Sequence, residues 1–496
     1  MSDPEYDVLV VGAGNAAFSA AHSAREQVDR VCVLEKAPAA ELGGNSYYTL
    51  GSMRATYGGL DDLRPLLDEL DEREAATFDL PPYTVDDFAA DMLRVTRGRT
   101  DPTLMRILVE DSFPTLQWLH RHGVKFKLQS DNQIFEVNGR KKFWGGGTIA
   151  TVGGGIGLIE QHLTEAKSTG IDVRVEHQMT GFLLGPAGAV EGVVCRTPAG
   201  EVVIRAKAVV LASGGFEADA RLRAVHLGPG WDTAKVRGSR YNTGEGLMSA
   251  LGIGAQAYGN WSGAHAVAWD INAGPYGNRV LTNKLQRHSY PFGITVNIEG
   301  RRFVDEGEHF RNYTYAKIGS AILRQTGGLA YQIFDQRGVG FLRTDYGHEG
   351  ASQVVADTIG ELAQKLGLDP ERLERTVAEY NAAIGEGTFD PTTLDGLRTN
   401  DVEPPKSNWA LPIAEPPFVG FPVGCAITFT YGGIRIDEDA RVLDQGDRPI
   451  PGLHAAGEVV GGLFYENYPG GSGLMSGAVF GRRAGATAAR YARSRA

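Results

Sequence analysis

The stretch DVLVVGAGNAA, residues 7–17, decides the fold of this protein. Its first five residues are a largely apolar run that predicts a buried strand, and the glycine-rich turn leads into a predicted helix over 18–26. A second apolar run over 30–35 ends in Glu35, which lies 21 residues after Gly14. Strand, turn, helix and strand, with G-x-G-x-x-A at the turn and an acid at that distance, are typical of a dinucleotide-binding unit.

The residues of the turn suit a bound pyrophosphate. Gly12 permits the tight turn, and Gly14 lets backbone N–H groups approach a phosphate at the helix N-terminus. Ala17 allows close packing of the helix on the strand, and the carboxylate of Glu35 can accept a hydrogen bond from a ribose hydroxyl. A glycine turn in a generic α/β domain is the alternative. The expected cofactor contacts in this turn are Gly12, Gly14, Asn15, Ala16 and Ala17.

A second glycine-rich segment indicates which dinucleotide is bound. ELGGNS at 41–46 and TLGS at 49–52 follow the ribose-binding strand directly, where nicotinamide-binding domains usually continue into a helix. Further along, an apolar strand ends in SGG, with Ser213 and Gly214 placed as in many flavoproteins. Although the first segment could be a plain loop, FAD fits these features better than NAD.

The chain divides into three parts by composition, and we expect an α/β fold. Residues 1–261 predict the first part of a Rossmann-like FAD-binding domain of the glutathione-reductase type, with a helical insertion at about 60–145. Residues 262–415 are richer in aromatic, histidine and arginine side chains and predict an inserted α+β domain that caps the substrate. Residues 416–496 return to glycine-rich α/β sequence and complete the FAD-binding domain.

Charge and cysteine content narrow the possible partners. The 49 basic and 60 acidic residues give a net charge of −11, and no Lys/Arg run resembles a phosphate-tracking stripe, so nucleic acid is not an expected partner. The three cysteines, Cys32, Cys195 and Cys425, lie far apart and lack metal-ligand spacing. We therefore expect a reducing compartment and no metal centre or iron–sulfur cluster in this chain.

No targeting or membrane-spanning segment is expected. The acidic N-terminus leads straight into the first strand, without the basic and apolar regions of an export signal. The longest uncharged stretch, 416–434, contains prolines and glycines that break a membrane helix. The expected location is the cytoplasm, with peripheral membrane association only through an electron-transfer partner.

An ordered set of motifs covers nearly the whole chain: GAGNAA, ELGGNS, LASGG, TGEG, GRRFVDE, AAGEVVGG and PGGSGL. In this set the sequence resembles the fumarate reductase/succinate dehydrogenase flavoprotein superfamily in its single-chain form. It is most similar to FAD-dependent tricarballylate dehydrogenases through RHSYPFGI at 287–294, FVDEG to FRNYTY within 303–315, TFTYGG at 428–433 and FYENYPGGSG at 464–473.

The resemblance implies a noncovalent FAD site. Glu35 and Lys36 would hold the adenosine half, and Glu458 the ribityl chain. The helix that begins near Ser472 would direct its dipole at the flavin. No histidine lies in the segment 41–51, where some relatives attach FAD covalently. The further contacts implied at the diphosphate and flavin are Gly43, Gly44, Asn45, Ser46, Gly51, Ser472, Gly473 and Leu474.

The resemblance also implies catalytic residues. Arg311 stands, with about one residue of register shift, where fumarate reductases carry an arginine that shuttles a proton. An arginine is normally a permanent cation, so this role requires a very basic carbon or neighbouring acids; a surface or ion-pair arginine is the alternative. We also expect His288, and Tyr468, which resembles a tyrosine of 3-ketosteroid dehydrogenases that donates to a substrate carbonyl, to be catalytic.

The expected substrate contacts are His265, Arg287, Tyr290, Phe429 and Tyr431. Two of the positions depart from the fumarate reductase pattern. Phe429 replaces a substrate-binding histidine, and Tyr468 replaces an arginine that clamps a carboxylate. Plain C4-dicarboxylate chemistry is therefore disfavoured.

Four functions are open at this point, three of them enzymatic. The first is FAD-dependent dehydrogenation of a CH–CH bond next to a carboxylate, with tricarballylate to aconitate as the specific prediction. The second, which the aromatic side chains favour, is desaturation of a 3-ketosteroid or natural-product ketone; the third is fumarate reductase-like activity. The fourth is a flavin-containing binding or sensor protein without turnover. For an enzyme, we expect a polycarboxylate or ketone substrate and a separate electron-acceptor protein.

Overall fold

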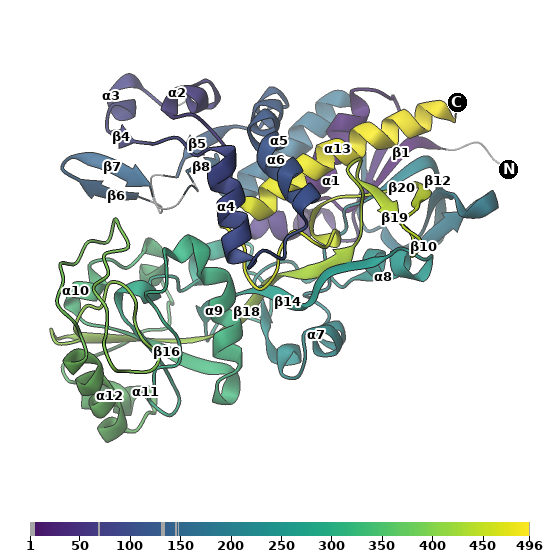
Figure 1. Cartoon of the computed structure of the whole chain (residues 1–496). Coiled ribbons are helices and arrows are strands. Elements are labelled where there is room, and N and C mark those ends of the chain that lie inside the picture. Colours follow the sequence, from purple (N-terminus) through teal and green to yellow (C-terminus); the bar gives the residue numbers. More distant parts are fainter. Residues whose placement is uncertain (1–4, 68–69, 130–133, 144–145, 147, 496) are drawn as a thin grey trace.

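The computed structural model describes residues 5–495 except 68–69, 130–133, 144–145 and 147 (Figure 1). Two sheets organise it: an eight-stranded sheet in one half of the molecule and a six-stranded sheet that reaches into the other half. Residues 1–4, which bear on the expected lack of an export signal, lie outside the described residues.

The eight-stranded sheet has the predicted dinucleotide-binding unit at its centre. Strand β1 pairs in parallel with β2 and with β12, and β12 pairs in parallel with β20, so segments from both ends of the chain form one sheet. The sequence expectation of an α/β fold with an inserted domain is confirmed. The strands are β1 (Tyr6–Val11), β2 (Val31–Leu34), β9 (Asp172–Arg174), β10 (Gln178–Leu184), β11 (Val190–Thr197), β12 (Gly200–Leu211), β19 (Arg441–Leu443) and β20 (Pro449–Ala455).

Two helices pack against each other on this sheet, and their small residues set the distance. Helix α1 (Asn15–Arg25) and helix α13 (Ser472–Ser494) lie side by side, purple and yellow in Figure 1. A Cβ atom at Gly481 would lie 2.5 Å from the carbonyl oxygen of Ala16, and one at Gly485 would lie 2.0 Å from that of Ala20. Glycine at these positions therefore lets the backbones approach, which brings the two helix N-termini to the same cleft.

The expected insertion at about 60–145 is only partly helical. Its longest elements are helices, but short strands also form, three of which make a small sheet of their own. The elements are α2 (Leu60–Leu63), α3 (Glu72–Ala75), β4 (Phe78–Asp79), α4 (Val85–Val95), α5 (Pro102–Arg121), β5 (Phe126–Leu128), β6 (Ile134–Val137) and β7 (Arg140–Phe143). Strand β8 (Ile149–Thr151) pairs with both β3 (Ser52–Met53) and β5 and forms a second three-stranded sheet. The helices that follow in the chain are α6 (Gly154–Thr169), α7 (Ala220–His226) and α8 (Glu245–Gly252).

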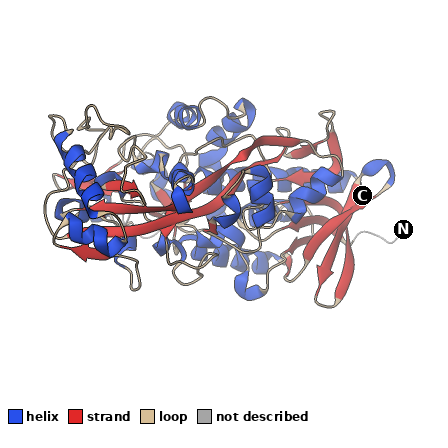
Figure 2. Cartoon of the chain, turned by 90° about the horizontal axis from the view of Figure 1, so that it is seen from below, coloured by secondary structure: helices blue, strands red, loops and turns tan. Residues whose placement is uncertain are grey.

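Two long antiparallel strands connect the halves. β14 (Ala257–Asp270) and β18 (Phe418–Ile434) run from the cofactor-binding half into the other half, and Figure 2 shows long strands crossing between the two. The expected domain boundary at 261 and 262 falls inside β14. The remaining elements are β13 (Lys235–Val236), β15 (Ile294–Asn297), α9 (Tyr315–Leu323), β16 (Leu329–Phe334), α10 (Gln336–Val339), β17 (Val354–Ala356), α11 (Ile359–Leu366) and α12 (Pro370–Ala382).

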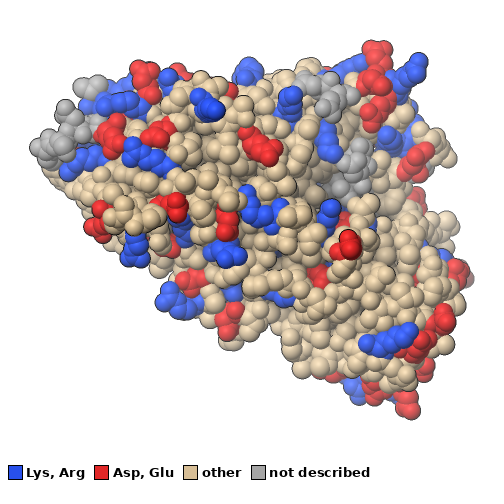
Figure 3. Space-filling view, turned by 180° about the vertical axis from the view of Figure 1, so that it is seen from behind, with Lys and Arg blue, Asp and Glu red and all other residues tan. Residues whose placement is uncertain are grey.

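The surface and the helices add two observations. On the face shown in Figure 3, basic and acidic side chains are interspersed. Among the residues that the structure describes, no helix is both long enough and apolar enough to cross a membrane.

Candidate active site

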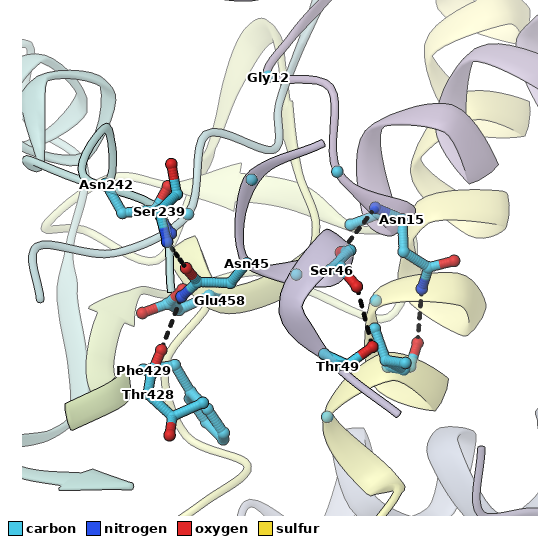
Figure 4. Close-up of a pocket in the computed structure, with 18 of the residues that line it drawn as sticks. Gly12, Asn15, Asn45, Ser46, Thr49, Ser239, Asn242, Thr428, Phe429 and Glu458 are labelled. Carbon is cyan, nitrogen blue, oxygen red and sulfur yellow. Dashed lines mark hydrogen bonds between the residues drawn. The ribbon is translucent and has the colours of Figure 1, made fainter. Parts of the chain in front are cut away.

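One large cleft, of about 1950 Å³ including its open mouth, lies where the two helix N-termini, the segment after β2 and the middle of β18 meet. In Figure 4, Ser46 lies beside Asn15, which follows the loop at Gly12, and the neighbouring Asn45 points toward Ser239 and Thr428. One part is lined mainly by backbone and small side chains, and the other by arginine, histidine and aromatic side chains. We call the first part the cofactor cradle, with Gly12, Gly14, Asn15 and Ser46 at its centre, and the second the substrate chamber, with His288, Arg311, Tyr315, Phe429 and Tyr468 at its centre.

The cofactor cradle has two helix N-termini without side-chain caps. Gly14 caps α1 and Gly471 caps α13, so neither helix has an N-cap side chain. Since first-turn N–H groups have no partner within a helix, both ends offer donors to an anion. Asn15 links them, because its Nδ2 donates to the carbonyl of Leu474 at 2.8 Å while its backbone N–H donates to Ser46 Oγ at 3.0 Å (Figure 4). These donors fit a diphosphate.

The glycines of the cradle leave no room for side chains. A Cβ atom at Gly12, whose φ is +108°, would lie 2.3 Å from the carbonyl oxygen of Ala212. A Cβ atom at Gly214, whose φ is +76°, would lie 2.8 Å from Asn242 Nδ2. The backbone therefore forms the wall of the cradle directly, as close approach of a cofactor requires.

Glu35 closes the end of the cradle expected to bind ribose. Its two carboxylate oxygens accept from the backbone N–H groups of Ala13, at 3.1 Å, and Ala37, at 2.8 Å. Burial raises the pKa of this carboxyl group in spite of those bonds. The adjacent Lys36 forms an ion pair of 2.8 Å with Glu245. The carboxyl of Glu35 is thus held rigidly at the cleft, where it can accept from a ligand hydroxyl.

A buried pair of carboxyl groups lies behind the middle of the cleft. Glu458 Oε1 accepts from the backbone N–H of Thr430 at 2.8 Å, and Glu217 Oε1 accepts from the amide of Asn45 at 2.6 Å. Burial, and next to it the charge of Glu217, holds the pKa of Glu458 well above its usual range. Burial also raises the pKa of Glu217, so two neighbouring carboxyl groups here both favour the protonated form more than they would in water.

Most of the residues predicted for the cofactor line the cleft: Gly12, Gly14, Asn15, Ala16, Glu35, Lys36, Gly44, Asn45, Ser46, Ser213, Gly214, Glu458, Gly473 and Leu474. Four do not line it and have packing roles instead. Ala17 is fully buried in the core, and a Cβ atom at Gly51 would lie 2.0 Å from Thr151 Oγ1. A Cβ atom at Gly43 would meet the side chain of Ile159, and Ser472 Oγ donates to the carbonyl of Pro469.

In the substrate chamber, the structure brings the three predicted catalytic residues together. Arg311, His288 and Tyr468 all line it and are all buried, although they come from distant parts of the chain. Burial, and after it the positive charge of Arg343, lowers the pKa of Arg311 to about 9. That shift favours the neutral guanidine more than in water, as the role predicted for Arg311 requires.

The histidines of the chamber are neutral. Burial, and then the nearby charge of Arg237, holds the pKa values of His265 and His288 well below their usual range. His288 Nε2 is buried without a hydrogen-bond partner, and it is available to a ligand in the chamber. His265 lies one layer behind: it does not line the cleft, and its ring packs against Tyr315, Tyr468 and Phe429.

Aromatic residues form one wall of the chamber. The hydroxyls of Tyr315 and Tyr468 are hydrogen-bonded to each other, and burial raises the pKa of both. Phe429 packs edge-on against Tyr468 and Tyr431, with ring centroids 5.3 Å apart in each pair. The predicted contacts Phe429 and Tyr431 therefore lie at the cleft.

Three of the predicted substrate contacts do not reach the chamber. Besides His265, these are Arg287 and Tyr290, both fully buried away from the cleft. The Arg287 guanidinium pairs with Asp270 at 2.6 Å and donates to three backbone carbonyls, so its role is structural. The Tyr290 hydroxyl is 2.6 Å from that of Thr314. The expectation that Arg287 would bind substrate is corrected by this ion pair.

Sequence reasoning also missed residues that line the chamber. The most important is Arg237, which follows β13; others are Tyr315, Gln286, Asn312 and Phe464. Tyr315 belongs to the motif FRNYTY, which could have singled it out. Arg237 stands in no catalytic motif, and only the pairing of β13 with β18 brings it to the site.

Comparison with known proteins agrees with this cleft. A family model described as "FAD binding domain" matches residues 7–474. A probable fumarate reductase of Shewanella frigidimarina is 29% identical over 497 residues, which cover 98% of this chain and 75% of the relative. The 4-oxocyclohexanecarboxylate 2-dehydrogenase of Sinomonas cyclohexanicum is 27% identical over 551 residues, which cover 95% of this chain and 90% of the relative.

A solved structure extends the comparison to the fold. The open conformation of a flavocytochrome c3 fumarate reductase matches with a TM-score of 0.74 and 28% identity, over 99% of this chain and 79% of that one. The chain belongs to the FAD-binding-domain family, within the fumarate reductase/succinate dehydrogenase flavoproteins. Its cofactor is FAD, and it is an FAD-dependent oxidoreductase that acts on CH–CH groups.

Proposed function

We propose that this protein removes two hydrogens across a carbon–carbon bond next to a carboxylate, and that tricarballylate, oxidised to aconitate, is its substrate. The observation that carries the proposal is the placement of Arg311, with its pKa lowered to about 9, beside neutral His288 in a buried chamber of the FAD cleft. The cations around this chamber suit a substrate with several carboxylates.

The chain and its cofactor divide the reaction. FAD supplies the hydride acceptor when it is bound in the cradle. Arg311, in its neutral form, accepts the proton from the carbon next to the carboxylate, so that one hydride and one proton leave the substrate and a double bond forms. His288, kept neutral by burial and by the neighbouring arginines, donates from its ring to a carboxylate oxygen of the substrate.

The protonation state of Arg311 should make the reaction rate depend on pH. Dehydrogenation needs the neutral guanidine, so kcat/KM with saturating electron acceptor rises about tenfold per pH unit below pH 9 and levels above it. In the reverse direction, double-bond reduction needs the cation, so its rate falls above that pH.

The aromatic wall supports a second candidate, desaturation of a ketone. The hydrogen-bonded hydroxyls of Tyr315 and Tyr468 can donate to a substrate carbonyl and stabilise the developing enolate. The name of the Sinomonas relative describes a substrate that is both a ketone and a carboxylate. Fumarate reductase-like activity, named for the Shewanella relative, would use the same proton donor in the opposite direction.

We propose that a separate carrier protein reoxidises the flavin, because the three cysteines are single and buried. We also propose that the FAD is noncovalent, so acid precipitation should leave the yellow colour in the supernatant.

The experiment that tests the proposed function is anaerobic stopped-flow absorbance of the oxidised flavoprotein with tricarballylate, succinate, citrate and a 3-ketosteroid, each added separately. We expect rapid bleaching with tricarballylate. Bleaching by the steroid alone would establish the ketone reaction, and a protein that bleaches with none of them would contradict both candidates.

A further inference from the structure

Arg237 enters the substrate chamber from a rigid piece of backbone. It follows β13, which pairs in parallel with Ala426 and Ile427 of β18, and its own backbone N–H donates to the carbonyl of Ile427 at 2.7 Å. Its side chain lines the cleft and is partly exposed. The position of the guanidinium is therefore set by the central sheet of the site.

The guanidinium is held by neutral groups that use only part of it. Nε and Nη2 both donate to Asn283 Oδ1, at 2.9 and 2.5 Å, and Nη1 donates to Thr428 Oγ1 at 3.2 Å. A guanidinium has five N–H donors, so two remain, one on each terminal nitrogen. Two such donors can hold a carboxylate through both of its oxygens.

The charge of Arg237 has no counter-ion in the described part of the chain. No carboxylate there forms an ion pair with it; the acid closest to it in effect, Asp345, is paired with Arg343 at 3.2 Å. The other charged or titratable groups that act on it or feel its charge are Tyr315, Tyr468, His265 and His288, none of which is an anion in the ordinary pH range. The local charge is therefore positive.

Three buried arginines of this fold are neutralised by ion pairs. Arg287 pairs with Asp270 at 2.6 Å, Arg302 pairs with Glu306 at 2.5 Å, and Arg54 pairs with Asp91 at 3.3 Å. Burial of a cation is costly unless an anion compensates it. Arg237 has no such ion pair, and it lines the cleft, where a ligand can supply the missing charge.

A second donor beside Arg237 also lacks an acceptor. Asn283 is buried, and its Nδ2 has no hydrogen-bond partner, although its Oδ1 holds the guanidinium. A buried amide without a partner is rare and expensive, and this one is a donor next to a cation. Because Arg237 lines the cleft and has no ion pair in the described part of the chain, its free donors indicate an acceptor-rich, negatively charged ligand group.

We propose that Arg237, oriented by Asn283 and Thr428, forms a carboxylate subsite that binds a carboxylate of the substrate other than the one next to the reacting bond. The inference rests on the proposed function, and it specifies the substrate class as acids with at least two separate carboxylates. Arg237 thereby takes over a clamp that the family pattern assigns elsewhere, where this chain has Tyr468.

The test measures binding without turnover. Aconitate and methylfumarate differ in that one carboxymethyl group is replaced by methyl, and neither can reduce oxidised flavin. Their dissociation constants follow from perturbation of the flavin spectrum in wild type, Arg237→Met, Arg237→Lys and the control Arg221→Met, which changes an exposed arginine paired with Asp219. In wild type we expect aconitate to bind about 10- to 100-fold tighter than methylfumarate.

In Arg237→Met we expect aconitate and methylfumarate to bind within about twofold of each other, with FAD affinity unchanged. In Arg221→Met we expect the wild-type preference for aconitate. Arg237→Lys should recover part of the preference, because lysine restores the positive charge but not the two parallel N–H donors of a guanidinium. An undiminished preference in Arg237→Met, or no preference in wild type, overturns the subsite. So does weakened FAD binding with the preference intact, which would make Arg237 a cofactor residue.

Flavin bleaching by tricarballylate, measured in the same preparations, tests the proposed function separately from the Arg237 subsite. Turnover by wild type with an unchanged preference in Arg237→Met leaves the function standing and removes the subsite. A preference that depends on Arg237, without turnover of tricarballylate, keeps the subsite and contradicts the function.

Discussion

The cofactor cradle and the substrate chamber occupy one cleft but are built in different ways. The cradle is made of backbone: glycines such as Gly12 and Gly214 form its wall, and helix N-termini without side-chain caps supply its donors. The chamber is made of side chains, with Arg237, Arg311 and His288 presented from distant segments. The difference teaches that the constant half of the reaction, binding of FAD, depends on chain geometry, whereas the choice of substrate depends on a few replaceable groups.

The largest effect should follow from removal of the proton acceptor. Arg311→Met should lower the rate of flavin reduction about 10²- to 10⁴-fold, because the proton on the substrate carbon loses its base. The visible spectrum of bound FAD should stay unchanged, since the cradle does not depend on this side chain. Stopped-flow measurement of flavin reduction checks the rate, and the FAD content of the purified variant checks cofactor binding. A variant that retains its rate would place the base elsewhere in the chamber.

A substitution at Gly12 should have the reverse effect, with weaker FAD binding and an unchanged rate of flavin reduction at saturating FAD. Gly12→Ala places a methyl group 2.3 Å from the carbonyl of Ala212 at a φ of +108°, so the turn must move. We expect FAD affinity to fall about 10- to 100-fold and the melting temperature of the apoprotein to fall as well. Titration of apoprotein with FAD measures this. At saturating FAD the reduction rate should recover, and failure to recover would show that the two regions are not separable.

Tyr468→Phe sharpens the comparison within the chamber. The change removes the hydroxyl bonded to Tyr315 and keeps the ring that packs against Phe429. If the substrate is an acid bound by arginines, reduction should slow by only about tenfold or less. A ketone substrate requires the hydroxyl at its carbonyl, and the loss should then reach about 10²- to 10³-fold. Comparison with Tyr431→Phe, whose hydroxyl is buried without a partner, controls for loss of a hydroxyl in general.

The smallest effect concerns stability near the cradle. His162 Nε2 is 3.1 Å from Asn15 Oδ1, and burial lowers the pKa of His162 to about 3. The unfolded chain takes up this proton near pH 6.5 and the folded protein only near pH 3, so stability present at pH 7 is lost as the pH falls through that window. The slope is about 1.4 kcal/mol per pH unit.

His162→Gln keeps an amide donor for Asn15 and removes the titration. Urea unfolding at pH 6, 5 and 4 should therefore show a shallower loss of unfolding free energy than in wild type. An equal slope in both proteins would mean that His162 does not contribute to the acid sensitivity.

The contrast between the cradle and the chamber also explains which site residues could be predicted from the sequence. Gly12, Gly14 and Glu35 act through the turn and strand in which they stand, so their spacing is enough to assign them. Arg287 and His288 are neighbours, yet one faces Asp270 in the core and the other faces the chamber, and no spacing distinguishes them. Arg237 reaches Thr428 only because β13 pairs with a strand about 190 residues further along the chain. Contacts over such separations depend on tertiary structure.

The long strands have an evolutionary consequence. Asp270, where β14 ends, is paired with Val423 of β18, so the chain leaves and re-enters the cofactor-binding half through neighbouring hydrogen-bonded residues. A short turn could join these points, so exchange of the segment 271–422 would leave the pairing of β14 and β18 around Thr428 and Phe429 in place. Thr428 and Phe429 remain with the scaffold in such an exchange, while His288 and Arg311 travel with the exchanged segment. New substrates can thus arise by recombination of whole segments as well as by point substitution.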